Sequence, residues 1–172
     1  KLTHDYQIIH LKQLSLENMM NFKNLALVAS TLSLALSGCA SVNMANPEES
    51  AQAQEFRAPA EGMSGLYVYR DSTLGGALKK DIWVDGNCLG ESAPHVFFFT
   101  QIPSGEHEIS TESEFSPNKL LLTTEAGQNY FIRQYIKLGA FVGGANLEQV
   151  SEQQGKEAVA KLKMATNGNC SK

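Results

Sequence analysis

Hydrophobic and polar positions change their pattern along this chain near residue 65. Beyond it, apolar runs are short or alternate with polar positions, and Gly, Pro, Asn and Asp interrupt them. This pattern is typical of antiparallel β structure, because the side chains of a strand point alternately to its two faces. We expect strands over residues 65–70, 80–84, 95–100, 105–111, 120–124, 130–136 and 147–150. The pattern therefore predicts a mainly β fold, a small antiparallel β-sandwich of about seven strands.

Two short motifs predict chain reversals between these strands. In VDGNCLG, residues 84–90, Asp-Gly stands where the chain must turn, since glycine tolerates positive φ and aspartate can bond to its own turn. In IPSGEH, residues 102–107, proline and then glycine favour the same outcome.

The run HVFFFT, residues 95–100, is apolar on both faces. It therefore predicts a central strand that is covered on both sides. The alternative is an exposed aromatic patch for a partner or for lipid.

A helix is expected only near the end of the chain. Ser151 is a suitable N-cap, and Ala158, Val159 and Leu162 offer a narrow apolar face. Gly155 weakens this prediction, since glycine disfavours a helix interior.

Before the β pattern begins, residues 39–62 are rich in Ala, Ser, Gln, Glu, Asn and Pro and show no apolar periodicity. This composition predicts a flexible tether, with the β-sandwich domain over residues 63–172.

Residues 20–38 have the architecture of a secretory signal: Lys23, then an uncharged apolar run over residues 25–36, then small residues. A dozen apolar residues are too few to span a bilayer, which takes about 20.

The sequence Leu36-Ser37-Gly38-Cys39 resembles the bacterial lipobox. That resemblance implies cleavage between Gly38 and Cys39, lipid on the Cys39 thiol and, with Ala40 next, sorting to the outer membrane. The alternative is an ordinary secretory signal that leaves Cys39 a free thiol.

Residues 1–19 begin without a methionine and carry Asp5, Lys12 and Glu17, ahead of an expected start at Met20 or, as the alternative, Met19. We interpret them as an over-extended gene start, so His4 and His10 within them receive no function.

The amino-acid composition limits the classes of partner that we expect. With 42% hydrophobic and 19% charged residues and a net charge of −4, the chain has the make-up of a globular domain and no concentration of positive charge. Nucleic acid is not expected as a partner, and no cofactor motif is present; the glycine-rich stretch over residues 138–146 lacks the Lys-Ser/Thr of a P-loop.

With Cys39 assigned to lipid, Cys88 and Cys170 remain as a pair in an oxidising compartment. They are candidates for a disulfide; the alternatives are two unpaired thiols, or redox chemistry without a Cys-x-x-Cys motif.

Candidate catalytic or metal-binding residues in the mature domain reduce to His95 and His107. On a strand, His107 faces away from Glu106 and Glu108, so a metal would need ligands from elsewhere, and a surface or edge histidine is the preferred interpretation. No Gly-x-Ser-x-Gly elbow is present.

The order GLYVYR, IWVDGNCLGE, FFFTQIPSGEHEI, LLLTTEAGQNYFIR and LEQVSEQQGKEAV from residue 65 onward resembles the bacterial family of unknown function numbered 2846. Members are small lipoproteins without an established activity. The Val-Asp-Gly strand end followed by Pro-x-Gly-x-His is also similar to PEGA-type β modules. The resemblance implies an envelope β domain and supplies no catalytic residues; Cys88 departs from many relatives.

Together these features predict a lipid-anchored envelope protein, its domain periplasmic, that acts as a non-catalytic binding module for peptidoglycan, another envelope protein or a surface ligand. One alternative is an envelope hydrolase or metal-binding enzyme that uses His95 or His107. The other is a structural lipoprotein that braces an envelope assembly.

Overall fold

A computed structural model of this protein describes residues 40–171. The expected gene start, the signal peptide and the Gly38–Cys39 cleavage and lipidation site lie outside the described residues, so these predictions stay untested. No helix of the described part is long and apolar enough to cross a membrane.

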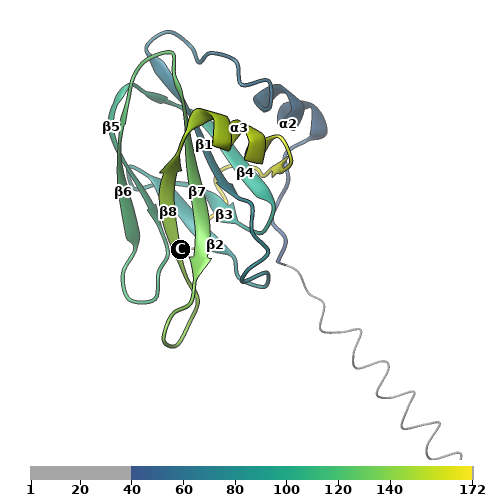
Figure 1. Cartoon of the computed structure of the whole chain (residues 1–172), viewed down its shortest axis with the longest axis vertical. Coiled ribbons are helices and arrows are strands. Elements are labelled where there is room, and N and C mark those ends of the chain that lie inside the picture. The colour runs from purple at the N-terminus through teal and green to yellow at the C-terminus, as the bar shows by residue number, and fades with distance from the viewer. Residues whose placement is uncertain (1–39, 172) are drawn as a thin grey trace, which may run out of the picture. The chain divides into compact units, whose positions relative to one another are not determined.

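The described chain is mainly β, as expected, and its strands form two sheets (Figure 1). The elements run in the order α2 (Pro47–Ala53), β1 (Met63–Arg70), β2 (Lys80–Val84), β3 (Asn87–Ser92), β4 (Val96–Pro103), β5 (Gly105–Thr111), β6 (Asn118–Thr124), β7 (Asn129–Lys137), β8 (Gly144–Val150), α3 (Glu152–Val159) and β9 (Lys163–Met164). One sheet has the order β8-β7-β1-β4-β9 and the other β3-β2-β5-β6.

Two of the strand pairs depart from the expected antiparallel arrangement. Strand β1 pairs with β7 in parallel, and β4 pairs with the two-residue β9 in parallel. The seven expected strands are all present; β3 and β9 are additional.

Both expected turns are confirmed. Asp85 and Gly86 connect β2 to β3 with φ of 51° and 77°. A two-residue hairpin turn of the primed type requires positive φ at both of these positions. Strand β4 ends at Pro103 and β5 begins at Gly105, so the Pro-Ser-Gly step makes the next reversal.

The five-stranded sheet is buried on both faces. Toward the four-stranded sheet it presents aliphatic and aromatic side chains such as Leu66, Val68 and Phe98. Its opposite face carries Tyr67, Tyr69, Phe97 and Phe131, which pack with Ala53, Val159 and Leu162. The alternating residues of β1 and β4 therefore serve two cores, and the prediction of a covered strand at residues 95–100 is confirmed.

The segment expected as a flexible tether is not free over its described residues. Ala53 and Phe56 belong to the second core, and the hydroxyl of Tyr67 donates to the carbonyl oxygen of Ala53 at 2.8 Å. Met44 forms a β-bridge with Ala165. Because a helix of seven residues buries so few side chains, it leaves no periodic apolar signal in the sequence.

Helix α3 is confirmed and begins as expected. The Ser151 side chain accepts from the backbone N–H of Gln154, and the two residues form a capping box. Packing explains why this helix contains Gly155 although glycine disfavours a helix interior. A Cβ at this position would lie 2.1 Å from Cγ of Phe131, so only glycine lets the helix approach the sheet.

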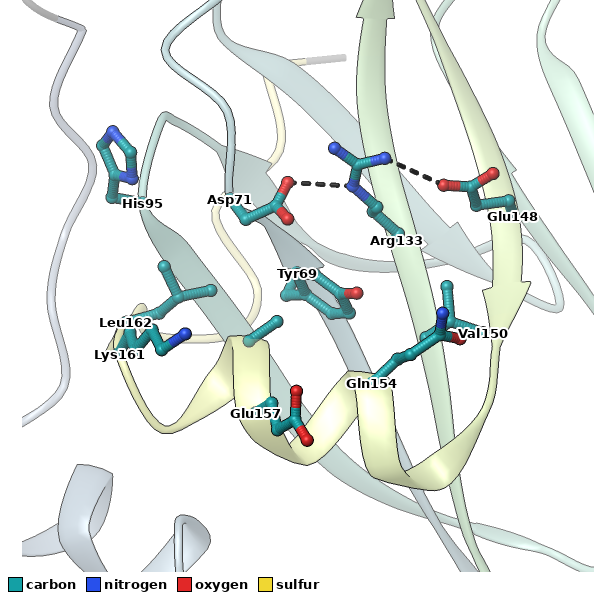
Figure 2. Close-up of a pocket in the computed structure, with 11 residues that line it drawn as sticks. Tyr69, Asp71, His95, Arg133, Glu148, Val150, Gln154, Glu157, Lys161 and Leu162 are labelled. Atoms are coloured by element: carbon teal, nitrogen blue, oxygen red, sulfur yellow. Dashed lines mark hydrogen bonds and ion pairs between the residues drawn. The ribbon is translucent and has the colours of Figure 1, made fainter.

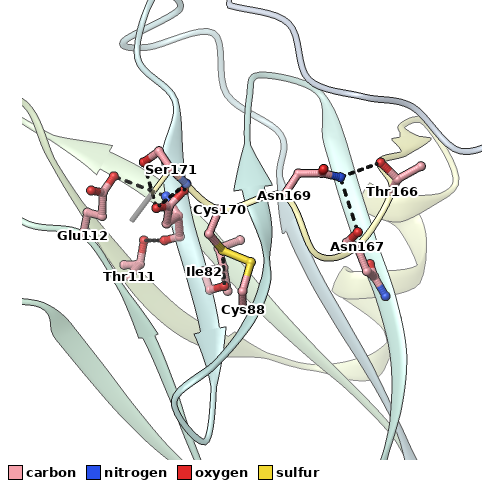
Figure 3. Close-up of a disulfide and its surroundings, with 10 residues drawn as sticks. Ile82, Cys88, Thr111, Glu112, Thr166, Asn167, Asn169, Cys170 and Ser171 are labelled. Carbon is pink, nitrogen blue, oxygen red and sulfur yellow. Dashed lines mark hydrogen bonds between the residues drawn. A yellow bond between two sulfur atoms is a disulfide. The ribbon is translucent and has the colours of Figure 1, made fainter.

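The expected disulfide is present. Cys88 on β3 and Cys170 in the C-terminal tail are bonded, with their Cα atoms 6.0 Å apart (Figure 3). Beside it, the backbone N–H of Ser171 donates to both carboxylate oxygens of the buried Asp81, at 3.1 and 3.0 Å.

The tail that carries Cys170 joins both sheets. Ala165 N–H donates to the carbonyl of Phe97 on β4, and Gly168 N–H donates to that of Leu89 on β3. The same tail pairs with the start of the described chain, because Thr166 N–H donates to the carbonyl of Asn43. The two ends of the described domain thus stabilise each other.

Candidate functional site

A polar groove of about 560 Å³ lies between helix α3 and the exposed end of the five-stranded sheet (Figure 2). Strand register creates it: Tyr69 of β1 pairs with Arg133 of β7, and Arg133 pairs with Glu148 of β8. These three residues form one row across the sheet on the face that helix α3 covers only in part.

Arg133 is the centre of this row. Its Nε donates to Asp71 at 2.9 Å and its Nη1 donates to Glu148 at 3.0 Å. These two hydrogen bonds raise the pKa of Arg133 above its ordinary value, against the effect of desolvation. About a third of the Arg133 and Asp71 side chains is exposed, and 45% of the Glu148 side chain, so each pair contributes at most about 1 kcal/mol to stability. Their main effect is to hold three charged groups in fixed positions.

The ring of Tyr69 lies between the charged side chains of Asp71 and Arg133 and helix α3, as Figure 2 shows. Its ring is buried, and its pKa is raised first by desolvation and then by the negative charge of Asp71. The phenol therefore stays neutral in the ordinary pH range, and its ring forms an apolar floor in a groove of charged side chains.

Helix α3 supplies the opposite wall. Gln154, Glu157 and Lys161 line the groove from this side. Each of these three side chains is exposed, and Lys161 follows the C-terminal end of the helix. The groove therefore displays both signs of charge on two facing walls.

The two histidines that the sequence proposed are not brought together. His95 lies in the turn before β4 with a φ of 60° and lines the far end of the groove, apart from the Arg133 row in Figure 2. His107 lies on β5, in the other sheet.

The expectation of a surface or edge position for His107 was wrong. The residue is buried, its Nδ1 lies 2.6 Å from Oδ2 of Asp85, and its Nε2 lies 2.7 Å from the carbonyl oxygen of Pro103. Desolvation lowers its pKa, but the bonds to Asp85 and Pro103 outweigh this effect and the pKa is raised. With both ring nitrogens engaged, the imidazole joins two turns and has no nitrogen left for proton transfer.

In the described range 40–171, no three His, Cys, Asp or Glu side chains gather closely enough to hold a metal ion.

The sequence analysis did not identify the groove residues, because it did not predict which strands are neighbours. Alternation does place Tyr69 with Asp71, Phe131 with Arg133, and Glu148 with Val150 on common faces. The sequence did not reveal that β1 and β7 are parallel neighbours, so it could not align these faces.

A mainly β domain of two sheets, closed by a disulfide and carrying a charged groove, is the class of protein that this fold and site define. Comparison with known proteins then assigns the chain to a family. The family described as "Protein of unknown function (DUF2846)" matches residues 60–145. An uncharacterised protein of Haemophilus influenzae strain Rd is 61% identical over 136 residues, which cover 79% of this chain and 81% of the relative. The chain belongs to the DUF2846 family, as its sequence motifs indicated. No solved structure matches it significantly.

Proposed function

We propose that this protein is a lipid-anchored component of the bacterial cell envelope, held at the outer membrane by acyl chains on Cys39. The lipobox-like Leu36-Ser37-Gly38-Cys39 supports the anchor. Each buried methylene contributes about 0.8 kcal/mol, so two or more acyl chains are sufficient for stable attachment. The Cys88–Cys170 disulfide agrees with an oxidising compartment.

We further propose that the domain acts as a non-catalytic binding module, and that the groove around Arg133 is its binding site. The observation that carries this proposal is the fixed row of charges opposite the exposed side chains of α3. Such a site suits a polar peptide that bears both carboxylate and ammonium groups, because each wall offers partners for both. The stem peptides of peptidoglycan have this chemistry.

The engagement of both His107 ring nitrogens supports a binding function over the alternative of a hydrolase that uses this histidine.

The anchor is tested by fractionation and mass spectrometry of the wild type and Cys39→Ser. We expect the wild type in the membrane fraction with acyl mass on Cys39, and the variant released. An equally membrane-bound Cys39→Ser protein, or a bare thiol in the wild type, would overturn the anchor.

The binding site is tested by cosedimentation with purified peptidoglycan. We expect the wild type to sediment and Glu157→Gln with Lys161→Gln to lose affinity by about three- to tenfold, the effect of removing two exposed charge contacts. The matched control is Glu108→Gln with Lys119→Gln, which removes an exposed ion pair of 3.0 Å on the other sheet. Failure of the wild type to sediment would exclude this ligand, and equal losses in both double variants would exclude the groove.

A further inference from the structure

One end of the described domain displays large apolar side chains on three loops, which connect β1 to β2, β5 to β6 and β7 to β8. Phe115, Leu138 and Phe141 are 83%, 89% and 87% exposed, values that leave almost the whole side chain in water. Leu74 and Val142 are also more than half exposed. Large apolar residues gathered at one end of a soluble domain mark a surface that binds something apolar.

The two hairpin loops are held together by one carboxylate. Glu114 of the β5–β6 loop accepts from the backbone N–H groups of Ala140, Phe141 and Val142 at 2.8, 2.5 and 3.3 Å. Desolvation raises the pKa of Glu114, but these three bonds outweigh it, so the pKa is lowered and the carboxylate stays charged. Three backbone N–H groups of the β7–β8 loop are therefore already hydrogen-bonded, which reduces the free-energy cost of moving this loop out of water.

The β1–β2 loop belongs to the same end. A Cβ at Gly143 would lie 2.5 Å from Cδ1 of Leu78, so this loop and the β7–β8 loop are in close contact. The buried Arg70 fixes the loop by donating to the carbonyls of Leu74, Gly75 and Leu78 at 3.0, 2.8 and 2.7 Å.

The described chain also begins here. The N–H of Ala40 donates to the carbonyl of Gly76 at 3.0 Å, and Figure 1 shows the start of the described chain at the end of the domain that carries the β7–β8 loop. Residues 43–45 then pair with the C-terminal tail, so no free length of chain separates Ala40 from the domain. Cys39 is one peptide bond from Ala40.

We infer that this apolar end is seated on the lipid bilayer, with Phe115, Leu138, Phe141 and Val142 in the interfacial region. The inference rests on the proposed lipidation of Cys39, because acyl chains on that residue would enter the bilayer beside these loops. The exposed Lys137, next to Leu138, suits an anionic headgroup. The domain is then mounted directly on the membrane, and not held away from it on a tether.

The test uses single cysteines in the full chain, expressed in a Gram-negative host, purified from its envelope in detergent and reconstituted into phosphatidylethanolamine/phosphatidylglycerol vesicles. Phe115→Cys and Phe141→Cys are labelled with an environment-sensitive fluorophore, and vesicles with brominated acyl chains quench labels at the interface. The control is Gln153→Cys, an exposed position of α3, which lies away from the β7–β8 loop in Figure 1. Mass spectrometry of the same samples reports lipid on Cys39.

We expect quenching at positions 115 and 141 to exceed that at 153 by severalfold. Equal quenching at all three positions, with lipid present on Cys39, would overturn the inference and leave the proposed anchor intact. A bare Cys39 would overturn the anchor, and the orientation inferred from it falls too. Disulfide-linked Phe141→Cys dimers without quenching would assign this end to a second copy and would also overturn the inference.

Discussion

At the scale of single residues, His107 is the clearest case of a side chain whose role depends on its partners. It bridges the Asp-Gly turn, through Asp85, and the Pro-Ser-Gly turn, through the Pro103 carbonyl. Asp85 is fixed in addition by the N–H of Glu108 at 2.8 Å. The two turns that the sequence predicted separately are therefore joined by a histidine that the sequence analysis expected at the surface or at an edge.

This bridge predicts a pH dependence of stability. The raised pKa of His107 contributes stability below its unfolded value of 6.5, and this contribution is lost as the pH rises through the folded pKa. Burial raises the pKa of Asp85, but its bonds with His107 and Glu108 outweigh this and lower it below 3.8, so that its contribution is lost as the pH falls through the folded pKa. The pair therefore contributes most between pH 3.8 and 6.5.

We expect His107→Asn to lower the free energy of unfolding by about 1–2 kcal/mol near pH 5.5, and by less near pH 9. Urea denaturation of wild type and variant at both pH values measures the difference. His95→Asn, in an exposed turn, is the control and should change little. A difference for His107→Asn that is the same at both pH values would contradict the assignment of a charged bridge.

At the scale of elements, the link between α2 and α3 decides whether the N-terminal segment belongs to the domain. The Gln54 side-chain amide, just after α2, donates to the carbonyls of Val159 and Leu162 at 2.9 and 3.0 Å, at the end of α3. The Val159 carbonyl, at the end of α3, also accepts from the N–H of Leu162, which lies in the turn that follows. The Gln54 amide therefore joins the residue after α2 to the last residue of α3 and to this turn.

Removing this link should loosen the helical layer. We expect Gln54→Ala to lower the free energy of unfolding by about 1–2 kcal/mol and to speed hydrogen exchange in α2. Gln52→Ala changes the same residue type two positions earlier, at an exposed position within α2, and should have little effect. Equal effects of the two substitutions would show that the segment contributes through helix propensity alone.

Sequence reasoning was most successful for elements with strong local signals. The alternating strands, the two turns and the N-cap at Ser151 each depend on neighbouring residues. It missed β3, where Gly90 interrupts the strand pattern. A Cβ at that position would lie 2.4 Å from Cε1 of Phe98, so the glycine serves a contact with β4 that the local sequence does not show.

At the scale of the whole molecule, the C-terminal tail and its disulfide hold the two sheets together. The bond joins residues 82 positions apart, so in the chain-entropy model it contributes up to roughly 4 kcal/mol by restricting the unfolded chain. Ser171 adds bonds to Asp81 from the same tail.

We expect Cys88→Ser with Cys170→Ser to lose roughly 2–4 kcal/mol of unfolding free energy. The same loss should follow reduction of the wild type, while the double variant should not respond to reductant. Denaturation curves with and without dithiothreitol measure both. A wild type whose midpoint does not change on reduction would show that the tail is held by its hydrogen bonds alone.

A buried polar connection also crosses between the sheets. Gln134 on β7 accepts from the hydroxyl of Ser92 and donates to the hydroxyl of Thr111 at 2.7 Å, and Thr111 donates to the carbonyl of Asp81. Each of these side chains is fully buried, so each depends on its partners for hydrogen bonds. This chain of bonds fixes how the two sheets are aligned.

The sequence by itself determined the β class, the positions of seven strands, two turns and a capped helix, and it identified the cysteines that pair. Local backbone preferences and alternation contain this information, because they act between residues a few positions apart. The family followed from the order of the same motifs.

Only the tertiary structure decided that β1 and β7 are parallel, that residues 40–62 pack on the domain, and that Tyr69, Arg133 and Glu148 form one groove. It alone also gathered three loops and the start of the described chain at one apolar end. These features depend on contacts between segments far apart along the chain. Their free energy comes from burial and pairing in the folded state, which no short stretch of sequence encodes.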